Sequence, residues 1–173
     1  IGYIYGILSS KKYSERYSSR LKLDFPSIPL TKNEKMFRSI SKEGLKVLNC
    51  HLLENTYTEA QLPQFIGAVG TNIEKISYSE ETVWINEART NGFKGVSKDV
   101  WKYSIGSYQV CEKWLKDRGP KKDKLGQALS KEDIKHYQKI ILALHESNSI
   151  INNIDNIIQS YGGWPNAFLK SID

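Results

Sequence analysis

Hydrophobic residues recur at three- and four-residue steps near both ends of the chain, which is the spacing of one face of a helix. Within residues 1–20 the side chains at this spacing that can pack are Tyr5, Leu8, Tyr13 and Tyr17. Pro26 and Pro29 then force an extended course, because the residue before a proline is pushed out of the helical region. We therefore predict a helix over residues 1–20 and a linker to residue 30.

A second helix is predicted over residues 33–54. Thr31 and Glu34 have the spacing of a capping box, in which the hydroxyl and the carboxylate satisfy free backbone N–H groups. The apolar residues that follow at helical spacing are Phe37, Ile40, Val47, Leu48 and Leu52.

A long C-terminal helical region is predicted over residues 130–161. Ser130 and Asp133 cap its start, and Gly162 and Gly163 end it. Its apolar stripe also contains Asn148 and Asp155. Either the region breaks into two helices near residue 147, or these polar groups find buried partners.

The middle of the chain has the composition of a small sheet. Residues 72–78 and 82–86 are rich in β-branched and aromatic side chains around a polar turn, which predicts a hairpin, and residues 92–95 can add a third strand. Ser97 is expected to cap a helical turn. A helix over residues 108–118 should end at Gly119 and Pro120 and lead into a surface loop over residues 119–129. The predicted fold class is α+β, with a small, mostly antiparallel sheet enclosed by N-terminal and C-terminal helices.

Length and composition predict one folded domain over residues 1–173. Hydrophobic residues make up 39% of the chain and charged residues 25%, which is ordinary for a globular domain. Apolar runs are too short to span a bilayer and no signal peptide is recognisable, so we expect no membrane partner and a cytoplasmic location. Because the chain opens at Ile1 within an apolar pattern, we expect it to be a fragment of a longer polypeptide.

No motif in the chain predicts catalysis, a bound cofactor or a metal site. His51, His136 and His145 have no nucleophile signature around them, and no glycine-rich loop has the ending of a phosphate-binding loop. Cys50 and Cys111 lack a partner at metal-ligand spacing and are expected to be buried.

The basic charge is unevenly distributed. The formal net charge is +6, with −1 on residues 130–173 and +7 on residues 1–129. Such asymmetry favours binding of a polyanion. The predicted contacts to DNA phosphates are Lys94, Lys113, Lys116, Arg118, Lys121 and Lys122. The predicted contacts to base edges are Asn86, Arg89, Asn91, Ser107 and Gln109, because arginine pairs with guanine and amides with adenine in the major groove. The competing interpretation is that these charges are only solvated.

Several blocks of the sequence resemble a known family. The segment 3–29 (YIYGILSS, then DFPSIP) resembles the part that follows the catalytic domain in N6-adenine DNA methyltransferases fused to restriction functions. The blocks 101–110 (WKYSIGSYQV), 113–118 (KWLKDR) and 133–137 (DIKHY) resemble the C-terminal specificity domain of Type ISP restriction-modification enzymes. In that family's glycine-glycine block this chain has Ser107.

The resemblance implies that a nuclease, an ATP-driven motor and a methyltransferase precede this domain in the parent enzyme. S-adenosylmethionine, ATP and Mg would then belong to the parent, and residues 1–30 would come from the upstream methyltransferase region. The expected function is sequence-specific recognition of double-stranded DNA that presents a target adenine to the upstream methyltransferase domain.

One alternative is an interdomain docking module without direct DNA contact, which predicts an exposed apolar stripe and no salt-dependent DNA binding. The aromatic residues Trp101, Tyr103, Tyr108 and Trp114 could stack on bases. Their helical spacing favours packing in the core instead.

Overall fold

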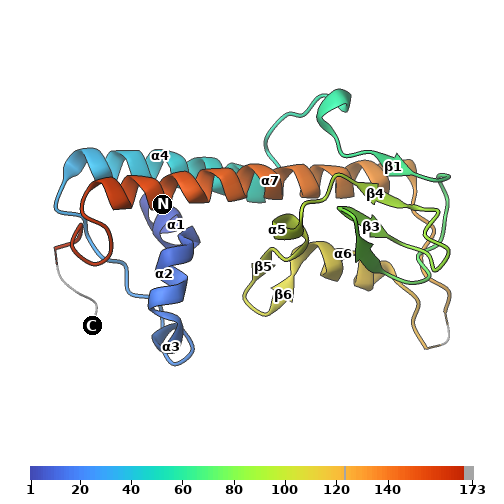
Figure 1. Cartoon of the computed structure of the whole chain (residues 1–173), viewed down its shortest axis with the longest axis horizontal. Coiled ribbons are helices and arrows are strands. Elements are labelled where there is room, and N and C mark those ends of the chain that lie inside the picture. Colours follow the sequence, from blue (N-terminus) through green and yellow to red (C-terminus); the bar gives the residue numbers. More distant parts are fainter. Residues whose placement is uncertain (123, 170–173) are drawn as a thin grey trace. The chain divides into compact units, whose positions relative to one another are not determined.

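A computed structural model describes residues 1–122 and 124–169. The contacts within the chain separate into two compact units, which are described individually. Unit 1 comprises Ile1–Glu54 and Glu146–Asp173, and unit 2 comprises Asn55–His145. Helix α7 (Lys131–Ser160) begins in unit 2 and ends in unit 1 (Figure 1).

Unit 1 is helical, and close packing of α1 (Gly2–Ser9) on α4 (Glu34–His51) forms its centre (Figure 1). Gly2 and Gly6 of α1 face Gly44 of α4. A Cβ atom added at Gly44 would lie 2.0 Å from the carbonyl oxygen of Gly2 and 2.6 Å from the backbone nitrogen of Gly6. The absence of side chains at these positions therefore allows the two backbones to touch.

The prediction of one helix over residues 1–20 is wrong. The structure has three short helices there, α1, α2 (Lys11–Arg16) and α3 (Ser18–Leu21). Ser10 interrupts the helix because its backbone is extended, with φ −59° and ψ 126°, and its hydroxyl oxygen accepts a hydrogen bond from the backbone nitrogen of Tyr13 at 3.1 Å. Ser10 is thus an N-cap in the middle of the apolar pattern.

Helix α4 confirms the second predicted helix, but its cap differs from the prediction. Asn33, not Thr31, is the N-cap, and its side-chain oxygen accepts hydrogen bonds from the backbone of Lys35 and Met36. Thr31 instead donates to the carbonyl oxygen of Asn33 at 2.9 Å. Asn33 is preferred because its extended backbone aims the amide oxygen at the first turn of the helix.

The C-terminal region is one continuous helix of 30 residues, α7. The capping box is confirmed: the Ser130 hydroxyl accepts from the Asp133 backbone, and the Asp133 carboxylate accepts from the Ser130 backbone, each at 3.1 Å. Asp155 is buried and accepts a hydrogen bond of 2.5 Å from Ser10. The side-chain nitrogen of Asn148 is buried without a hydrogen-bond partner in the part of the chain that the structure describes.

Unit 2 contains an antiparallel sheet with the strand order β1-β4-β3-β2. The strands are β1 (Phe65–Ile66), β2 (Ser77–Ser79), β3 (Thr82–Trp84) and β4 (Gly92–Lys94). The predicted hairpin and third strand are confirmed, although residues 72–76 lie outside the hairpin and β1 was not predicted. Val83 pairs with Phe93, and both pack with Tyr137 and Ile141 of α7 in the core of the unit.

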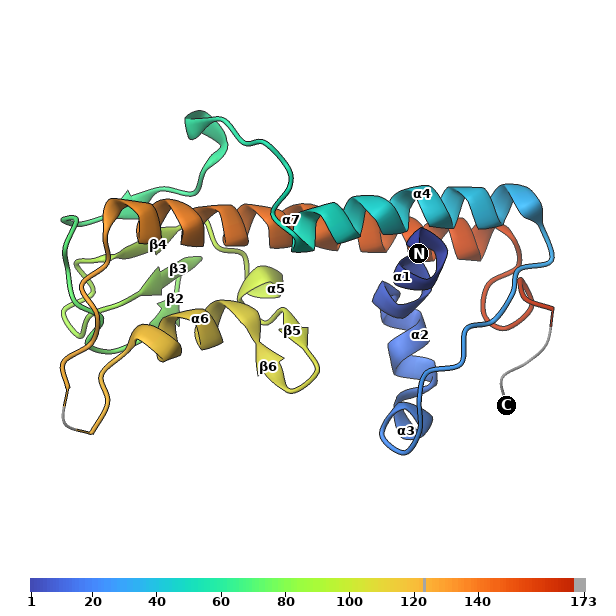
Figure 2. The same cartoon turned by 180° about the vertical axis from the view of Figure 1, so that it is seen from behind.

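A second, two-stranded sheet lies before the basic part of the chain. The segment contains α5 (Lys98–Trp101), capped by Ser97 as predicted, then β5 (Ser104–Ile105), β6 (Tyr108–Gln109) and α6 (Val110–Arg118). Helix α6 therefore begins two residues later than the predicted helix over residues 108–118, because residues 108 and 109 pair with β5. Figure 2 shows β5 and β6 as a separate hairpin between α5 and α6.

The observed architecture is α+β, as predicted from the sequence. Each of the described helices is too short or too polar to cross a membrane. Both cysteines are buried, again as predicted.

Candidate nucleic-acid interface

The lysines of α6 are held by acidic side chains one helical turn away. Lys113 forms an ion pair with Asp117, and Lys116 forms one with Glu112 at 3.0 Å. These i,i+4 pairs follow from helical geometry. The positive charge of α6 is therefore largely balanced on the helix itself.

The segment that follows, residues 119–126, is called the basic loop here. The side chains of Lys121, Lys122 and Lys124 are exposed, and none has a partner among the described residues. The backbones of Lys121 and Lys124 bond to each other in both directions, at 3.0 and 2.9 Å. The backbones of Lys121 and Lys124 are thus held together, while the side chains of the three lysines remain exposed.

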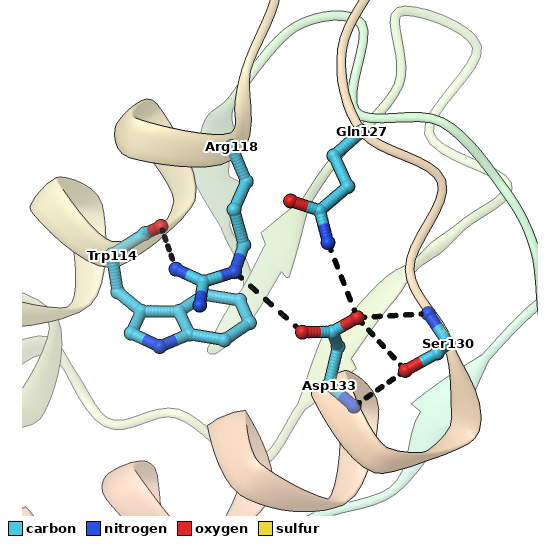
Figure 3. Close-up of polar contacts among 5 residues, drawn as sticks. All are labelled: Trp114, Arg118, Gln127, Ser130 and Asp133. Carbon is cyan, nitrogen blue, oxygen red and sulfur yellow. Dashed lines mark hydrogen bonds and ion pairs between the residues drawn. The ribbon is translucent and has the colours of Figure 1, made fainter.

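Arg118 closes the base of the basic loop (Figure 3). Its guanidinium carbon lies 3.7 Å from the centre of the Trp114 ring, and one terminal nitrogen donates to the Trp114 carbonyl oxygen at 3.3 Å. Its Nε lies 3.6 Å from a carboxylate oxygen of Asp133, an ion-pair distance. The backbone nitrogen of Gln127 donates to the Arg118 carbonyl oxygen at 2.7 Å. Arg118, Trp114 and Asp133 form what we call the Arg118 clamp.

Asp133 connects the clamp to the start of α7. Its second carboxylate oxygen accepts hydrogen bonds from the backbone and hydroxyl of Ser130, at 3.1 and 2.8 Å, and from the side chain of Gln127 at 3.4 Å (Figure 3). Burial alone raises the pKa of Asp133, but the hydrogen bonds from Ser130 and the charge of Arg118 outweigh it and lower the pKa. The carboxylate is therefore ionised at neutral pH and pairs with Arg118.

The loop between β3 and β4, residues 85–91, is organised by Asn86. Asn86 is 7% exposed, and its side-chain oxygen accepts from the backbones of Thr90 and Asn91 at 3.1 and 3.0 Å. Its side-chain nitrogen donates to the Thr90 hydroxyl at 2.8 Å. Arg89 has a φ of 54° and an exposed side chain. The buried amide thus holds a tight turn that presents Arg89.

The remaining predicted base contacts differ in availability. The side-chain nitrogen of Asn91 donates to the Thr71 hydroxyl at 3.3 Å, and the side-chain nitrogen of Gln109 donates to the Trp101 carbonyl oxygen. Ser107 is exposed in the turn between β5 and β6. Asn91 and Gln109 are therefore occupied inside unit 2, while Ser107 faces solvent.

The predicted site residues accordingly divide into two groups. Five are exposed, with no side-chain partner among the described residues: Arg89, Lys94, Ser107, Lys121 and Lys122. Six are engaged within the protein: Asn86, Asn91, Gln109, Lys113, Lys116 and Arg118. Contact with DNA remains a prediction for all of them.

Two features of this surface were absent from the predicted contacts. Lys124 belongs to the same unpaired group as Lys121 and Lys122, and its place in the basic run could have indicated it. Ile105 and Tyr108 are exposed on the hairpin. The helical spacing of the aromatic residues obscured Tyr108, because the strand β6 was not predicted.

The described residues do not assemble a metal centre. No group of three or more histidine, cysteine, aspartate or glutamate side chains among them could hold a metal ion. Burial raises the pKa of Cys111 to about 12, so its thiol stays protonated at neutral pH.

Known proteins resemble this chain in sequence and in fold. A family model described as the Type ISP C-terminal specificity domain matches residues 1–153, which confirms the resemblance noted in the sequence. The chain is similar in structure to the ATP-dependent Type ISP restriction-modification enzyme LlaBIII bound to DNA, with a TM-score of 0.60 and 18% identity over 90% of this chain and 11% of that chain.

A nuclease-deletion mutant of the Type ISP restriction-modification enzyme LlaGI in complex with a DNA substrate mimic gives a TM-score of 0.58 and 22% identity. That similarity covers 91% of this chain and 15% of that chain. At these identities the likeness shows a shared fold. The chain spans only a small part of either enzyme. Curated protein sequences gave no match.

Proposed function

The chain belongs to the family of Type ISP C-terminal specificity domains, and we propose that its unit 2 recognises a sequence in double-stranded DNA. The observation that carries this proposal is the basic loop, whose three lysines are exposed and unpaired among the described residues while the Arg118 clamp holds the base of the loop. The DNA named for both similar structures supports it.

Phosphates are the natural ligands of the basic loop. Lysine acts as a compact point charge toward a phosphate, and neutralising a phosphate releases condensed counterions. Among the described residues, no acidic side chain pairs with Lys121, Lys122 or Lys124, so their charge is available to a phosphate. Lys94, Lys113 and Lys116 are assigned additional, weaker contacts to phosphates.

Base edges are assigned to Arg89 and Ser107. Arginine makes two parallel hydrogen bonds to guanine in the major groove, and serine can donate to or accept from several bases. Asn86 and Gln109 are assigned the role of positioning these groups, because their amides are bound within unit 2. Phosphate contacts then set the register, and base contacts set the sequence.

The experiment that tests this proposal is selection from a pool of random duplexes. The chain should enrich one sequence, and Arg89→Ala should relax the preference at one guanine position, at a cost of about 1–3 kcal/mol in discrimination. Arg38→Ala is the matched control, since Arg38 is an exposed arginine of unit 1. A folded chain that binds no duplex at low salt, or that enriches the same sequence after Arg89→Ala, contradicts the assignment.

We further propose that recognition presents an adenine to the methyltransferase of the parent enzyme. Enzymes that modify a base take it out of the stack, so a reader must fix the duplex relative to the catalytic pocket. S-adenosylmethionine, ATP and Mg are assigned to the parent and to none of the described residues. In the parent enzyme, Arg89→Ala should change which sequence is methylated and leave S-adenosylmethionine affinity unchanged.

A second candidate function, docking to the upstream methyltransferase domain, is favoured by an apolar stripe on unit 1. Ile4 and Leu8 of α1 lie at helical spacing with its N-cap residue Ile1, and all three side chains are exposed. In the parent enzyme, the double variant Ile4→Ser, Leu8→Ser should make the connection between unit 1 and the methyltransferase domain accessible to limited proteolysis. If the stripe is only exposed surface, the cleavage pattern stays unchanged. Docking and DNA reading can coexist, because they use different units.

A further inference from the structure

The β5–β6 hairpin is a short ribbon with a free end. Gly106 and Ser107 form its two-residue turn, and only Gly106 has a positive φ, 58°, which is the pattern of a type II′ turn. A Cβ atom added at Gly106 would meet nothing within 4 Å. The turn therefore projects into solvent.

Two large apolar side chains lie on this ribbon and are left uncovered. Ile105 pairs with Tyr108 across the hairpin, so their side chains project from the same face. Ile105 is 56% exposed and Tyr108 is 61% exposed. The prediction that Tyr108 packs in the core is wrong. Trp101, Tyr103 and Trp114 do pack against the core of unit 2.

The base of the hairpin is firmly attached to unit 2. The backbone nitrogen of Val110 donates to the Tyr103 carbonyl oxygen at 3.0 Å, and the Gln109 side chain donates to the carbonyl oxygen of Trp101. The Trp101 ring in turn stacks on Tyr78, with ring centres 5.4 Å apart and an angle of 5° between the planes. Because the base of the hairpin is fixed, its exposed tip can enter a binding partner without having to become ordered first.

The sequence around the hairpin carries an excess of basic residues, and one of them lies beside the tip. Lys113 places its ammonium group 5.9 Å from the centre of the Tyr108 ring. From Lys94 to Lys124 the chain carries nine basic residues and four acidic ones. Figures 1 and 2 both show the β5–β6 hairpin on the side of unit 2 that faces away from α7.

We propose that Ile105 and Tyr108 form a wedge that inserts at a base step of the bound duplex and kinks it. Apolar side chains that enter from the minor groove partly unstack a base step and bend the DNA, and aromatic rings stack on any base regardless of sequence. A two-stranded ribbon can be used in either groove. This inference rests on the proposed DNA recognition and adds that the duplex is deformed as it is read.

The test measures affinity and bending together. A duplex of the enriched sequence carries a donor dye and an acceptor dye at its ends, so that energy transfer reports the end-to-end distance at saturating protein. The wild-type chain should shorten this distance. The double variant Ile105→Ala, Tyr108→Ala should bind roughly tenfold more weakly and leave the duplex straight at saturation.

Two further variants separate the wedge from the phosphate contacts. Tyr108→Phe should keep the bend, because the ring rather than the hydroxyl makes the stack. Lys122→Gln should weaken binding and give the wild-type bend once the duplex is saturated. Thermal unfolding of each variant should match that of the wild type, since all of these side chains are exposed.

The outcomes distinguish this inference from the proposal beneath it. If the wild-type chain binds no duplex, DNA recognition by this chain fails, and the wedge fails with it. If the wild type binds and the double variant matches it in affinity and bend, the wedge is wrong while recognition stands. If the double variant only abolishes self-association of the chain, the tip contacts a second copy and the wedge is again overturned.

Discussion

Helix α6 and the basic loop are adjacent, similarly basic in sequence, and different in the state of their charges. On α6 each of the lysines Lys113 and Lys116 has an acidic partner one turn away. In the loop, Lys121, Lys122 and Lys124 are exposed and unpaired among the described residues. A count of basic residues treats the two regions alike, whereas the structure separates charge that is already balanced from charge that is available.

The free energy of an exposed ion pair sets the size of the difference between the α6 lysines and the loop lysines. An exposed ion pair is worth about 0–1 kcal/mol, so the α6 lysines can leave their partners at a modest cost. A loop lysine has no acidic partner to leave among the described residues, and it gains the release of counterions from a phosphate. The loop should therefore dominate affinity, and α6 should contribute a smaller increment.

Removing the loop charges should have the largest effect on binding. The triple variant Lys121→Gln, Lys122→Gln, Lys124→Gln should lose about two orders of magnitude in affinity near 0.1 M salt, because three phosphate contacts disappear. Lys113→Gln, Lys116→Gln is the control and should lose less than about tenfold. Fluorescence anisotropy with a labelled duplex measures both, and equal losses would remove the distinction between the two regions.

Loosening the Arg118 clamp should come next. Asp133→Ala removes the Arg118 ion pair and the reciprocal cap with Ser130, and we expect the free energy of unfolding to fall by about 1–2 kcal/mol. Chemical denaturation measures this change. The same variant should bind DNA less tightly, because the base of the loop is no longer held.

The effect on binding is informative because its sign opposes simple electrostatics. Removing an acidic residue by itself favours binding to a polyanion. Asp117→Ala, which removes an acid from α6 and leaves the clamp intact, should therefore bind more tightly than the wild type. Tighter binding by Asp133→Ala as well would mean that the clamp does not position the loop.

Removing the acidic partners of the α6 lysines should make α6 contribute more to DNA affinity, as the basic loop does. Glu112→Gln, Asp117→Asn leaves Lys113 and Lys116 without their carboxylate partners, and we expect affinity to rise by about two- to fivefold. The salt dependence of binding should steepen at the same time. An unchanged affinity would place α6 outside the DNA interface.

The smallest expected effect is the pH dependence of the clamp. Because the pKa of Asp133 is lowered in the folded chain, its contribution to stability is complete above the ordinary aspartate value of about 3.9 and is lost as the pH falls through the lower folded value. The difference in Tm between the wild type and Asp133→Asn should be constant near neutral pH and shrink below about pH 4. A constant difference at all pH values contradicts the ion pair.

Local signals in the sequence predicted much of the fold. The helix at α4, the N-caps at Ser97 and Ser130, and the stop at Gly119 depend on residues a few positions apart. The errors have two sources. Strand β1 has only two residues and pairs with the distant β4, whereas β6 pairs with β5 across a two-residue turn, a local signal that the helical spacing of the aromatic residues hid.

The candidate site shows the same division. The pairing of Lys113 with Asp117 can be read from their spacing, and the exposure of the basic loop follows from its composition. The engagement of Arg118 by Asp133 joins residues far apart in sequence, and the burial of Asn86 depends on the tight turn it holds. Residue type alone therefore could not separate side chains that face solvent from those that stabilise the loops.

Lysine reactivity in the presence of saturating duplex DNA tests the central claim most directly. The chain is acetylated with and without DNA, and modification at each lysine is compared by mass spectrometry, with the exposed Lys42 of unit 1 as internal reference. Lys121, Lys122 and Lys124 should become strongly protected by DNA, Lys113 and Lys116 partly so, and Lys42 should remain reactive. Loop lysines that stay as reactive as Lys42 on saturated DNA would contradict the assignment of the basic loop to the phosphate backbone.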